Sequence, residues 1–225
     1  MAEYMTDTNA RRRARGFAVA LALLVAVPAS LRAQATDRPA SGVAAVADSS
    51  LRRDLLRLLA EDQAGREGLG SAAARGDTVY MRRFLTADSL RSLWLATLVA
   101  ERGWPVARDV GQEGVHAAFI LLQHSPDTAF QARMLPTVER AAVAGELPAA
   151  DVAMLTDRVL VQAGRPQRYG SSFRVVGGRL VADPIDDPAG LEARRRAVGM
   201  PAMADYARLL GEMYKLPVDW PPLPR

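Results

Sequence analysis

Apolar residues recur at the three- and four-residue spacing of a buried helix face over most of residues 50–215. The clearest stripe consists of Leu51, Leu55, Leu58 and Leu59. Similar stripes, bounded by capping residues, glycines and prolines, predict seven helices. These helices cover residues 51–66, 87–102, 113–124, 125–144, 148–162, 187–198 and 201–213. We therefore predict a mainly α fold, a single multi-helix domain over residues 50–215.

Two segments interrupt this helical pattern. Residues 65–78 contain four glycines and are predicted to form a loop. Pro136 falls inside the fourth helix, where a proline removes a backbone donor and costs about 3 kcal/mol. We therefore expect a kink or a break in that helix near residue 135.

The pattern changes to that of a hairpin after the fifth helix. Residues 173–176 and 179–181 read as two short strands, and Gly177-Gly178 between them is typical of a two-residue turn. An isolated hairpin is only marginally stable in water, so these strands must pack against the helices. The sequence thus adds one small β-hairpin to the helical domain.

The N-terminal segment has the three parts of a secretory signal peptide. A basic stretch (residues 11–16) precedes an uncharged apolar run (residues 17–31), and Ala33 and Ala35 supply the small residues of a cleavage site. A membrane anchor is the alternative, but a spanning helix needs about 20 residues and this run is shorter. We predict a signal peptide over residues 1–35 and a protein that is exported, periplasmic or extracellular.

Two segments flank the predicted domain. Residues 36–49 are rich in alanine, serine and proline and predict a flexible linker. Residues 216–225 contain four prolines and predict an extended Pro-rich tail. That tail is either a peptide ligand of the PxxP kind or an ordinary terminus with Trp220 folded back on the domain.

Composition and charge exclude several classes of protein. The chain has 225 residues, 49% hydrophobic and 24% charged, which is typical of globular domains. The formal net charge is +4, but without the first 35 residues 24 basic residues face 23 acidic ones. We therefore predict no nucleic-acid partner. The absence of cysteine excludes disulfides and thiolate metal sites.

Asp62 and the two histidines are the first candidate site. Asp62 continues the leucine stripe of the first helix, so it points inward and needs a partner, for which Arg66 is one candidate. His116 and His124 lie at opposite ends of the third helix, about 12 Å apart along its axis. They cannot easily share one metal ion, so we predict no metal site and no cofactor. Two interpretations stay open, an internal salt bridge or an acid–base site of Asp62, His116 and His124.

A second polar cluster comprises Asp157, Arg158, Gln167, Arg168 and Tyr169. Guanidinium groups bind carboxylates and phosphates through paired hydrogen bonds, so these residues are candidate ligand-binding groups. The alternative is an arginine-rich solvated loop in which Asp157 pairs with one of the arginines.

Several short motifs follow one another in a characteristic order. They are Glu61-Asp62-Gln63, Gly103-Trp104-Pro105, Val110-Gly111, His116-Ala117-Ala118, Gln123-His124, Asp157-Arg158-Val159, Gln167-Arg168-Tyr169-Gly170 and Pro184-Ile185-Asp186-Asp187-Pro188. The pattern resembles a bacterial family of uncharacterised proteins, a domain of unknown function, over residues 51–206. The resemblance implies these polar signature positions: Asp62, His116, Gln123, His124, Asp157, Arg158, Gln167 and Tyr169. That family follows Tyr-Gly with Thr-Gln, whereas this chain has Ser171-Ser172.

Two hypotheses of function follow. The first is an exported binding or interaction domain for an unknown small molecule or protein, with no stable membrane span after signal cleavage. The alternative is a hydrolase-type enzyme in which Asp62 orients a histidine that activates water. Geometry separates them: a site requires Asp62, a histidine and residues 165–169 around one open pocket, whereas a sealed salt-bridged core indicates a structural role.

Overall fold

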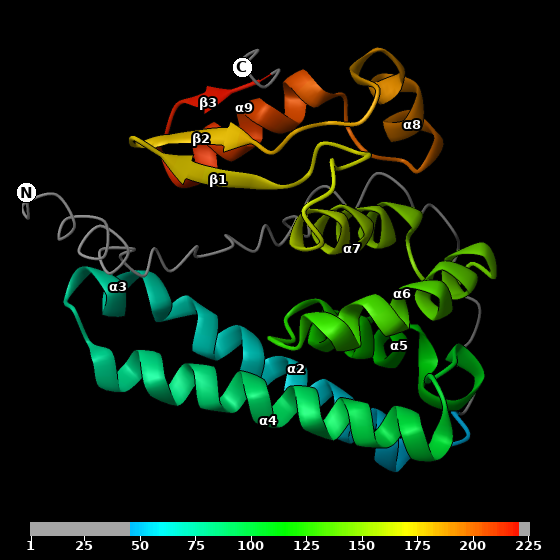
Figure 1. Ribbon diagram of the computed structural model, residues 1–225. Coiled ribbons are helices and arrows are strands. Elements are labelled where there is room, and N and C mark those ends of the chain that lie inside the picture. The colour runs from blue at the N-terminus through cyan, green and yellow to red at the C-terminus, as the bar shows by residue number, and fades with distance from the viewer. Residues whose placement is uncertain (1–45, 221–225) are drawn as a thin grey trace, which may run out of the picture.

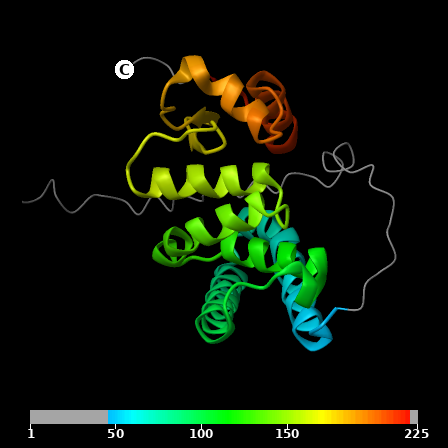
Figure 2. The ribbon, with the colours of Figure 1, turned by 90° about the vertical axis from the view of Figure 1, so that its right-hand side faces the viewer.

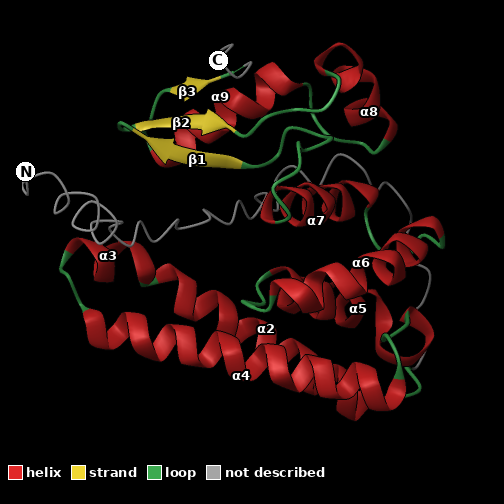
Figure 3. Ribbon diagram, in the orientation of Figure 1, coloured by secondary structure: helices red, strands yellow, loops and turns green. Residues whose placement is uncertain are grey.

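The computed structural model describes residues 46–220 and confirms a mainly helical fold. Helices α2 to α7 form the larger part of the molecule, and a smaller layer of strands and helices covers one side of α7 (Figure 1). Figure 3 shows that the strands lie in this smaller layer. The predicted signal peptide, most of the linker and the last five residues of the predicted tail lie outside the described residues.

The described elements follow one another along the chain. They are α2 (Ser49–Glu67), α3 (Leu69–Ala74), α4 (Thr78–Arg102), α5 (Ala107–Gln123), α6 (Thr128–Val143), α7 (Ala149–Gln162), β1 (Phe173–Val176), β2 (Arg179–Ala182), the 3-10 turn η1 (Pro188–Gly190), α8 (Leu191–Ala197), α9 (Met203–Tyr214) and β3 (Val218–Asp219). Within residues 46–220, no helix is long and apolar enough to cross a membrane.

Aspartate caps fix where three of the helices begin. Asp48, Asp77 and Asp127 precede α2, α4 and α6, and each carboxylate accepts the backbone N–H three residues further on at 2.8–2.9 Å. Such a bond satisfies one of the donors that the first turn of a helix leaves free. The fourth predicted helix therefore begins at Thr128 and not at residue 125.

The predicted loop at residues 65–78 is wrong, because α3 forms within it and α4 begins at Thr78, well before the predicted start at residue 87. Tertiary contacts outweigh the glycines here. The first turns of α4 bury Phe84 against α2, and the hydroxyl of Tyr80 donates to the carbonyl of Gly65 at 2.7 Å. Side-chain packing of α4 on α2 thus extends the helix beyond its local sequence signal.

Two further helix predictions need correction. Helix α6 runs through Pro136 without a break, with Met134 and Val138 buried on either side of it. Proline has no backbone N–H, so one hydrogen bond of the helix is missing at Pro136. The burial of Met134 and Val138 stabilises this turn of the helix in its place. Helix α5 begins six residues before the predicted start, and its regular course is interrupted at Gly111 (φ 71°), a conformation that favours glycine.

Two apolar clusters define the layers. The larger one joins α2, α4, α5, α6 and α7, with Leu55, Leu95 and Phe119 fully buried at its centre. The smaller one lies beneath the sheet and includes Leu180 and Met203. Figure 2 shows α7 between the other helices and the smaller layer. Its side chains pack on both sides, since Val152 and Leu155 belong to the larger cluster and Met154 packs with Met200.

The predicted hairpin is confirmed residue by residue. Strands β1 and β2 pair antiparallel from Phe173–Ala182 to Val176–Arg179, and Gly177 and Gly178 both have positive φ. Tyr206 of α9 contacts the ring of Phe173, with 6.2 Å between the ring centroids. The first residues of the predicted tail form β3, which pairs parallel to β2 and which the sequence did not predict.

Candidate functional site

Asp62 forms the centre of a buried polar network. Its side chain is fully buried because position 62 continues the buried leucine stripe of α2. Its Oδ2 lies 2.6 Å from Nδ1 of His124, the residue that follows the last turn of α5. The prediction that Asp62 points inward and has a partner is confirmed, and Arg66 is one of its partners.

Two arginines balance the charge of this network. Arg66 donates to both oxygens of Asp62 at 3.0–3.2 Å and reaches Asp88 at 3.2 Å. Arg91 donates to Asp88 at 2.6 Å and lies 3.8 Å from Asp62. Buried charges are tolerated when they are paired in this way, so two carboxylates and two guanidiniums compensate one another.

The proton arrangement at His124 follows from the distances. Nδ1 lies 2.6 Å from Asp62 Oδ2 and 2.7 Å from Arg66 Nε. In a neutral imidazole this nitrogen either carries a proton and donates or has a lone pair and accepts, so it cannot do both. Two bare lone pairs at 2.6 Å would repel, so Nδ1–H donates to Asp62. Arg66 Nε–H then donates to the same carboxylate, at 3.1–3.2 Å from its two oxygens.

The environment keeps this pair as a neutral imidazole beside a carboxylate. Burial lowers the pKa of His124 below its ordinary value, and this outweighs the opposite effect of Asp62. Burial alone would raise the pKa of Asp62, but the hydrogen bonds from His124 and Arg66 hold it below its usual value. The network is therefore a compensated, sealed assembly.

A small pocket lies where α7 meets the smaller layer. Its volume is about 110 Å³. That is well above the roughly 10–15 Å³ that a single water requires and below the roughly 300 Å³ at which drug-sized sites begin. The lining residues come from the ends of α5 and α7, the segment entering β1, the end of β2 and α9. They are Gln123, Met154, Arg158, Val161, Gln162, Ser171, Ser172, Phe173, Asp183 and Tyr206.

Arg158 is the distinctive group of this pocket. Its Nη1 donates to the backbone carbonyl of Gln123 at 2.7 Å, and no carboxylate of the described chain lies within ion-pair distance of it. Burial, followed by the nearby charge of Arg66, lowers the pKa of Arg158 to about 10. The guanidinium is still charged at neutral pH, and among the described residues it has no ion-pair partner.

Gln123 adds a second polar group to the pocket. The residue is only 5% exposed, yet within residues 46–220 its side-chain amide has no hydrogen-bond partner. Its backbone carbonyl, in contrast, accepts from Arg158 and from Gln131. An amide that is buried by its neighbours and lines a pocket presents both a donor and an acceptor to whatever enters.

Asp157 shapes one wall of the pocket from behind. Its fully buried carboxylate accepts the backbone N–H groups of Arg168, Tyr169 and Ser171 at 2.7–2.9 Å, and the hydroxyl of Ser171 at 2.7 Å. It thus replaces the backbone partners that this loop lacks. Asp157 positions the loop and does not face the pocket.

The side chain of Gln167 links the same loop to the end of β2 through hydrogen bonds. Its side-chain amide donates to the carbonyls of Ser172 and Asp183 at 3.0 and 2.8 Å, and its oxygen accepts from the N–H of Ser172. Three of the four hydrogen bonds that a side-chain amide can make are thus formed. Gln167 therefore holds the two pocket segments at a fixed separation.

Arg168, Tyr169 and His116 lie outside the pocket. Arg168 is exposed, and its guanidinium lies 5.8 Å from the ring centre of Tyr169. Nδ1 of His116 lies 3.9 Å from a carboxylate oxygen of Asp151 at the start of α7. The structure thus brings Asp62 and His124 together but pairs His116 with a different carboxylate.

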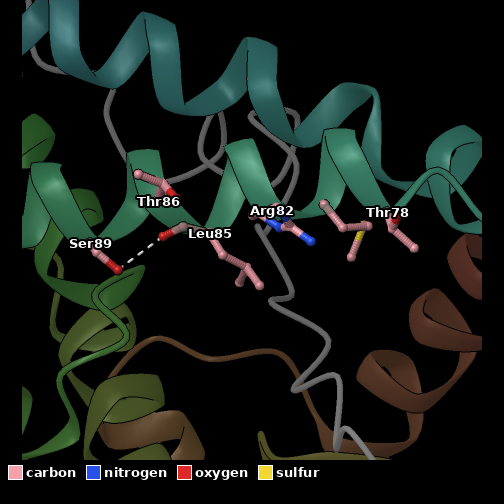
Figure 4. A pocket seen from close by; sticks show the side chains of 6 residues that line it. Thr78, Arg82, Leu85, Thr86 and Ser89 are labelled. Carbon is pink, nitrogen blue, oxygen red and sulfur yellow. Dashed lines mark hydrogen bonds between the residues drawn. The ribbon is translucent and has the colours of Figure 1, made fainter.

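A larger hollow runs along α4, but it offers little chemistry. Its volume is about 430 Å³, and the residues lining it all belong to one face of α4, as Figure 4 shows. They are Thr78, Met81, Arg82, Leu85, Thr86 and Ser89. The hydroxyl of Ser89 already donates to the carbonyl of Leu85. With one exposed arginine and no group from a second element, this hollow is a weaker candidate than the Arg158 pocket.

Comparison with known proteins identifies the family. Residues 49–219 match the family described as a family of unknown function (DUF6624). The chain belongs to this family. No curated protein and no solved structure matches the chain. Within the described part of this DUF6624 protein, no group of three or more His, Asp or Glu side chains is arranged to hold a metal ion.

Six of the eight polar positions that the resemblance implied fall into three groups in space. Asp62 and His124 belong to the buried network, and Asp157 and Gln167 hold the loop. Gln123 and Arg158 line the pocket. These six residues therefore lie around the junction of α5, α7 and the smaller layer, and two of them, Gln123 and Arg158, line the pocket there.

Several pocket residues were not singled out from the sequence. Ser172, Asp183 and Tyr206 all line the pocket. Ser172 carried a signal, because it lies where this chain departs from the Thr-Gln of the resembled family. Asp183 directly follows a strand, and Tyr206 lies in an otherwise apolar stripe, but neither pattern marks a pocket until the fold brings α9 and β2 to α7.

Acid should destabilise the DUF6624 domain through His124. The ordinary pKa of histidine is about 6.5, and burial beside Arg66 and Arg158 lowers that of His124 despite its bond to Asp62. Below about pH 6.5 the unfolded chain therefore binds a proton that the folded chain does not, and the free energy of unfolding falls by up to about 1.4 kcal/mol per pH unit. Urea unfolding at pH 7, 6 and 5 measures this.

The variant His124→Asn checks the assignment. Its amide can still donate to Asp62 but does not titrate, so we expect the loss of stability between pH 6.5 and 5 to become smaller. His116→Asn is the matched control, because it removes the other histidine and leaves the Asp62–His124 bond in place. An unchanged acid dependence in His124→Asn would show that another group causes it.

Proposed function

We propose that this DUF6624 protein is a binding protein for a small anionic ligand, which it holds on Arg158 in the pocket between α7 and the smaller layer. The observation that carries the proposal is a buried, charged guanidinium that lines a pocket and has no carboxylate of the described chain within ion-pair distance. An uncompensated buried charge is costly, whereas an anionic ligand would supply the missing counterion.

The other buried arginines differ from Arg158 in their partners or in their position. Arg66 and Arg91 pair with carboxylates and therefore need no external anion. Arg195 is fully buried without a carboxylate, but it donates to the carbonyls of Pro201 and Tyr169 and does not line the pocket. Arg158 alone of these four combines an unneutralised charge with an opening.

The remaining walls suit a small organic ligand. Arg158 can give two parallel hydrogen bonds to a carboxylate or phosphate. The amide of Gln123 and the hydroxyl of Ser172 supply further polar contacts, while Met154 and Phe173 provide apolar surface. A few convergent polar groups among apolar walls is the usual composition of a small-molecule site.

Replacing Arg158 by methionine should weaken binding of the anion about 10- to 100-fold. That range corresponds to the roughly 1.5–3 kcal/mol of a hydrogen bond to a charged group. Titration calorimetry of the folded protein with acetate, phosphate and L-alanine measures it. Arg165→Met is the matched control, because Arg165 is an exposed arginine that does not line the pocket.

Two results would contradict the proposal. One is that none of the three compounds binds the unaltered protein in a saturable way. The other is that Arg158→Met binds as tightly as the unaltered protein while Arg165→Met does the same. Circular dichroism and thermal unfolding establish that each variant is folded before its binding is measured.

The enzyme hypothesis receives no comparable support. A hydrolase would need the imidazole of His124 beside its substrate, with Asp62 behind it. Neither residue lines the Arg158 pocket, and the carboxylate of Asp62 is already occupied by Arg66 and His124. We therefore prefer a binding role.

We further propose that the protein is exported from a bacterial cell and loses residues 1–35. The support is the basic stretch, the short uncharged run and the small residues before position 36. Mass spectrometry of the protein expressed in a bacterial host tests this. A product in the periplasm or medium that begins near residue 36 supports export, and a cytoplasmic product that retains residues 1–35 contradicts it.

A further inference from the structure

Asp183 adds a carboxylate to the lining of the pocket, opposite in charge to the guanidinium of Arg158. Both residues line the same space of about 110 Å³. The backbone of Asp183 is fixed, because its N–H donates to the carbonyl of Ser172 at 3.0 Å and its carbonyl accepts from Gln167 at 2.8 Å. Its carboxylate is therefore held at the pocket by the loop and the sheet together.

The protein neutralises Asp183 only weakly. Nε of Arg174 lies 3.2 Å from Oδ1 of Asp183, but the side chain of Arg174 is 57% exposed, against 15% for Asp183. An ion pair to an exposed arginine contributes little, because solvent screens it. Within residues 46–220, the second oxygen, Oδ2, has no hydrogen-bond partner.

We propose that the ligand is a small zwitterion of the α-amino acid class, whose carboxylate binds Arg158 and whose ammonium group binds Asp183. This inference rests on the proposed function and specifies its ligand. The pocket offers one cation and one carboxylate, which a ligand with one group of each sign complements without leaving either wall charge unpaired.

Size and wall chemistry narrow the class. A space of this volume takes a molecule of a few non-hydrogen atoms, so the two charges of the ligand must be close together, as in an α-amino acid. Met154, Val161 and Phe173 form apolar walls beside the charged pair. A short apolar side chain such as that of alanine therefore fits the site better than a long or charged one.

Three ligands of similar size separate the contributions of the two charges. L-Alanine carries both charged groups, propionate lacks the ammonium group, and ethylamine lacks the carboxylate. We expect calorimetry on the folded protein to show at least about tenfold tighter binding of L-alanine than of either other compound, which corresponds to about 1.4 kcal/mol.

A variant of Asp183 provides a second test of the zwitterion. Asp183→Asn should weaken L-alanine binding about tenfold or more and leave propionate binding unchanged or slightly tighter, whereas Arg158→Met should weaken both. Asp186→Asn is the matched control, because Asp186 is an exposed carboxylate three residues further on that does not line the pocket. Thermal unfolding verifies that each variant folds.

The outcomes distinguish this inference from the proposed function. If propionate binds as tightly as L-alanine and Asp183→Asn changes neither, the zwitterion is wrong while the anion site stands. If neither propionate nor L-alanine binds the unaltered protein, and acetate and phosphate do not bind either, the proposed function is wrong and the inference fails with it.

Discussion

Replacing Asp62 by alanine should lower the free energy of unfolding by about 3–5 kcal/mol, the usual cost of removing one partner of a buried ion pair. The side chain of Asp62 is fully buried and accepts from Arg66 and from His124. Its removal leaves Arg66 with only Asp88 as a carboxylate partner. The Nδ1–H of His124 loses its acceptor. Urea denaturation followed by circular dichroism measures the change.

Asp54→Ala is the control for this prediction. Asp54 lies on the same helix, but its side chain is 48% exposed, and within residues 46–220 it pairs only with the exposed Arg57 at 3.4 Å. Surface substitutions of this kind usually change stability by less than about 0.5 kcal/mol. A loss below about 1 kcal/mol in Asp62→Ala would contradict the view that this carboxylate organises the buried network.

Replacing Asp157 by alanine should cost about 3 kcal/mol or more. Three backbone N–H groups, those of Arg168, Tyr169 and Ser171, lose their acceptor at once, and each buried donor without a partner costs about 1–3 kcal/mol. The loop that carries Ser171 and Ser172 to the pocket then loses its fixed shape. Urea denaturation gives the total effect, and amide hydrogen exchange identifies the three N–H groups.

Two comparisons make the Asp157 result specific. Asp157→Asn keeps one acceptor oxygen and should lose less stability than Asp157→Ala. Asp205→Ala removes an exposed carboxylate whose nearest cation is Arg208 at 3.7 Å, and should change little. If the amides of residues 168, 169 and 171 stay as protected in Asp157→Ala as in the unaltered protein, the carboxylate is not what holds this loop.

The helical body could be predicted because its signals are local. Leucine stripes and turn-forming glycines act over a few residues, and they located α7, α9 and the β1–β2 hairpin within one or two residues. The inward direction of Asp62 followed from the same periodicity. The spacing of apolar residues within one segment determines which side of its helix is buried, so this side can be predicted from that segment alone.

Elements that depend on distant contacts could not be predicted in this way. The start of α4 is stabilised by burial of Phe84 against α2, and β3 forms only because Leu180 and Val181 of β2 offer it an edge. Helix α6 tolerates Pro136 because its neighbours are buried. In each case tertiary packing outweighs local propensity.

The candidate site was predictable only in part for the same reason. Arg158 and Gln123 were predicted as polar signature residues, but their proposed function depends on Arg158 having no carboxylate within ion-pair distance among the described residues, which no sequence pattern reports. Asp183 and Tyr206 join them from β2 and α9 across the junction of the two layers. Conversely, Asp157 and Gln167 were predicted to bind a ligand, but they hold a loop. Buried polar residues that hold a loop are of the same types as residues that bind a ligand, so the sequence alone does not separate the two.

The most direct test of the proposed site is to locate bound L-alanine by nuclear magnetic resonance. The folded, isotope-labelled protein is titrated with L-alanine, and the side-chain amide of Gln123, the Nε–H of Arg158 and the backbone N–H of Ser172 are followed. These three signals should shift together and saturate, while the backbone N–H of Leu51, which donates to Asp48 at the start of α2 and does not belong to the pocket, should not move. Unchanged signals at Gln123, Arg158 and Ser172, or saturable shifts confined to α4, would contradict the assignment of this pocket as the binding site.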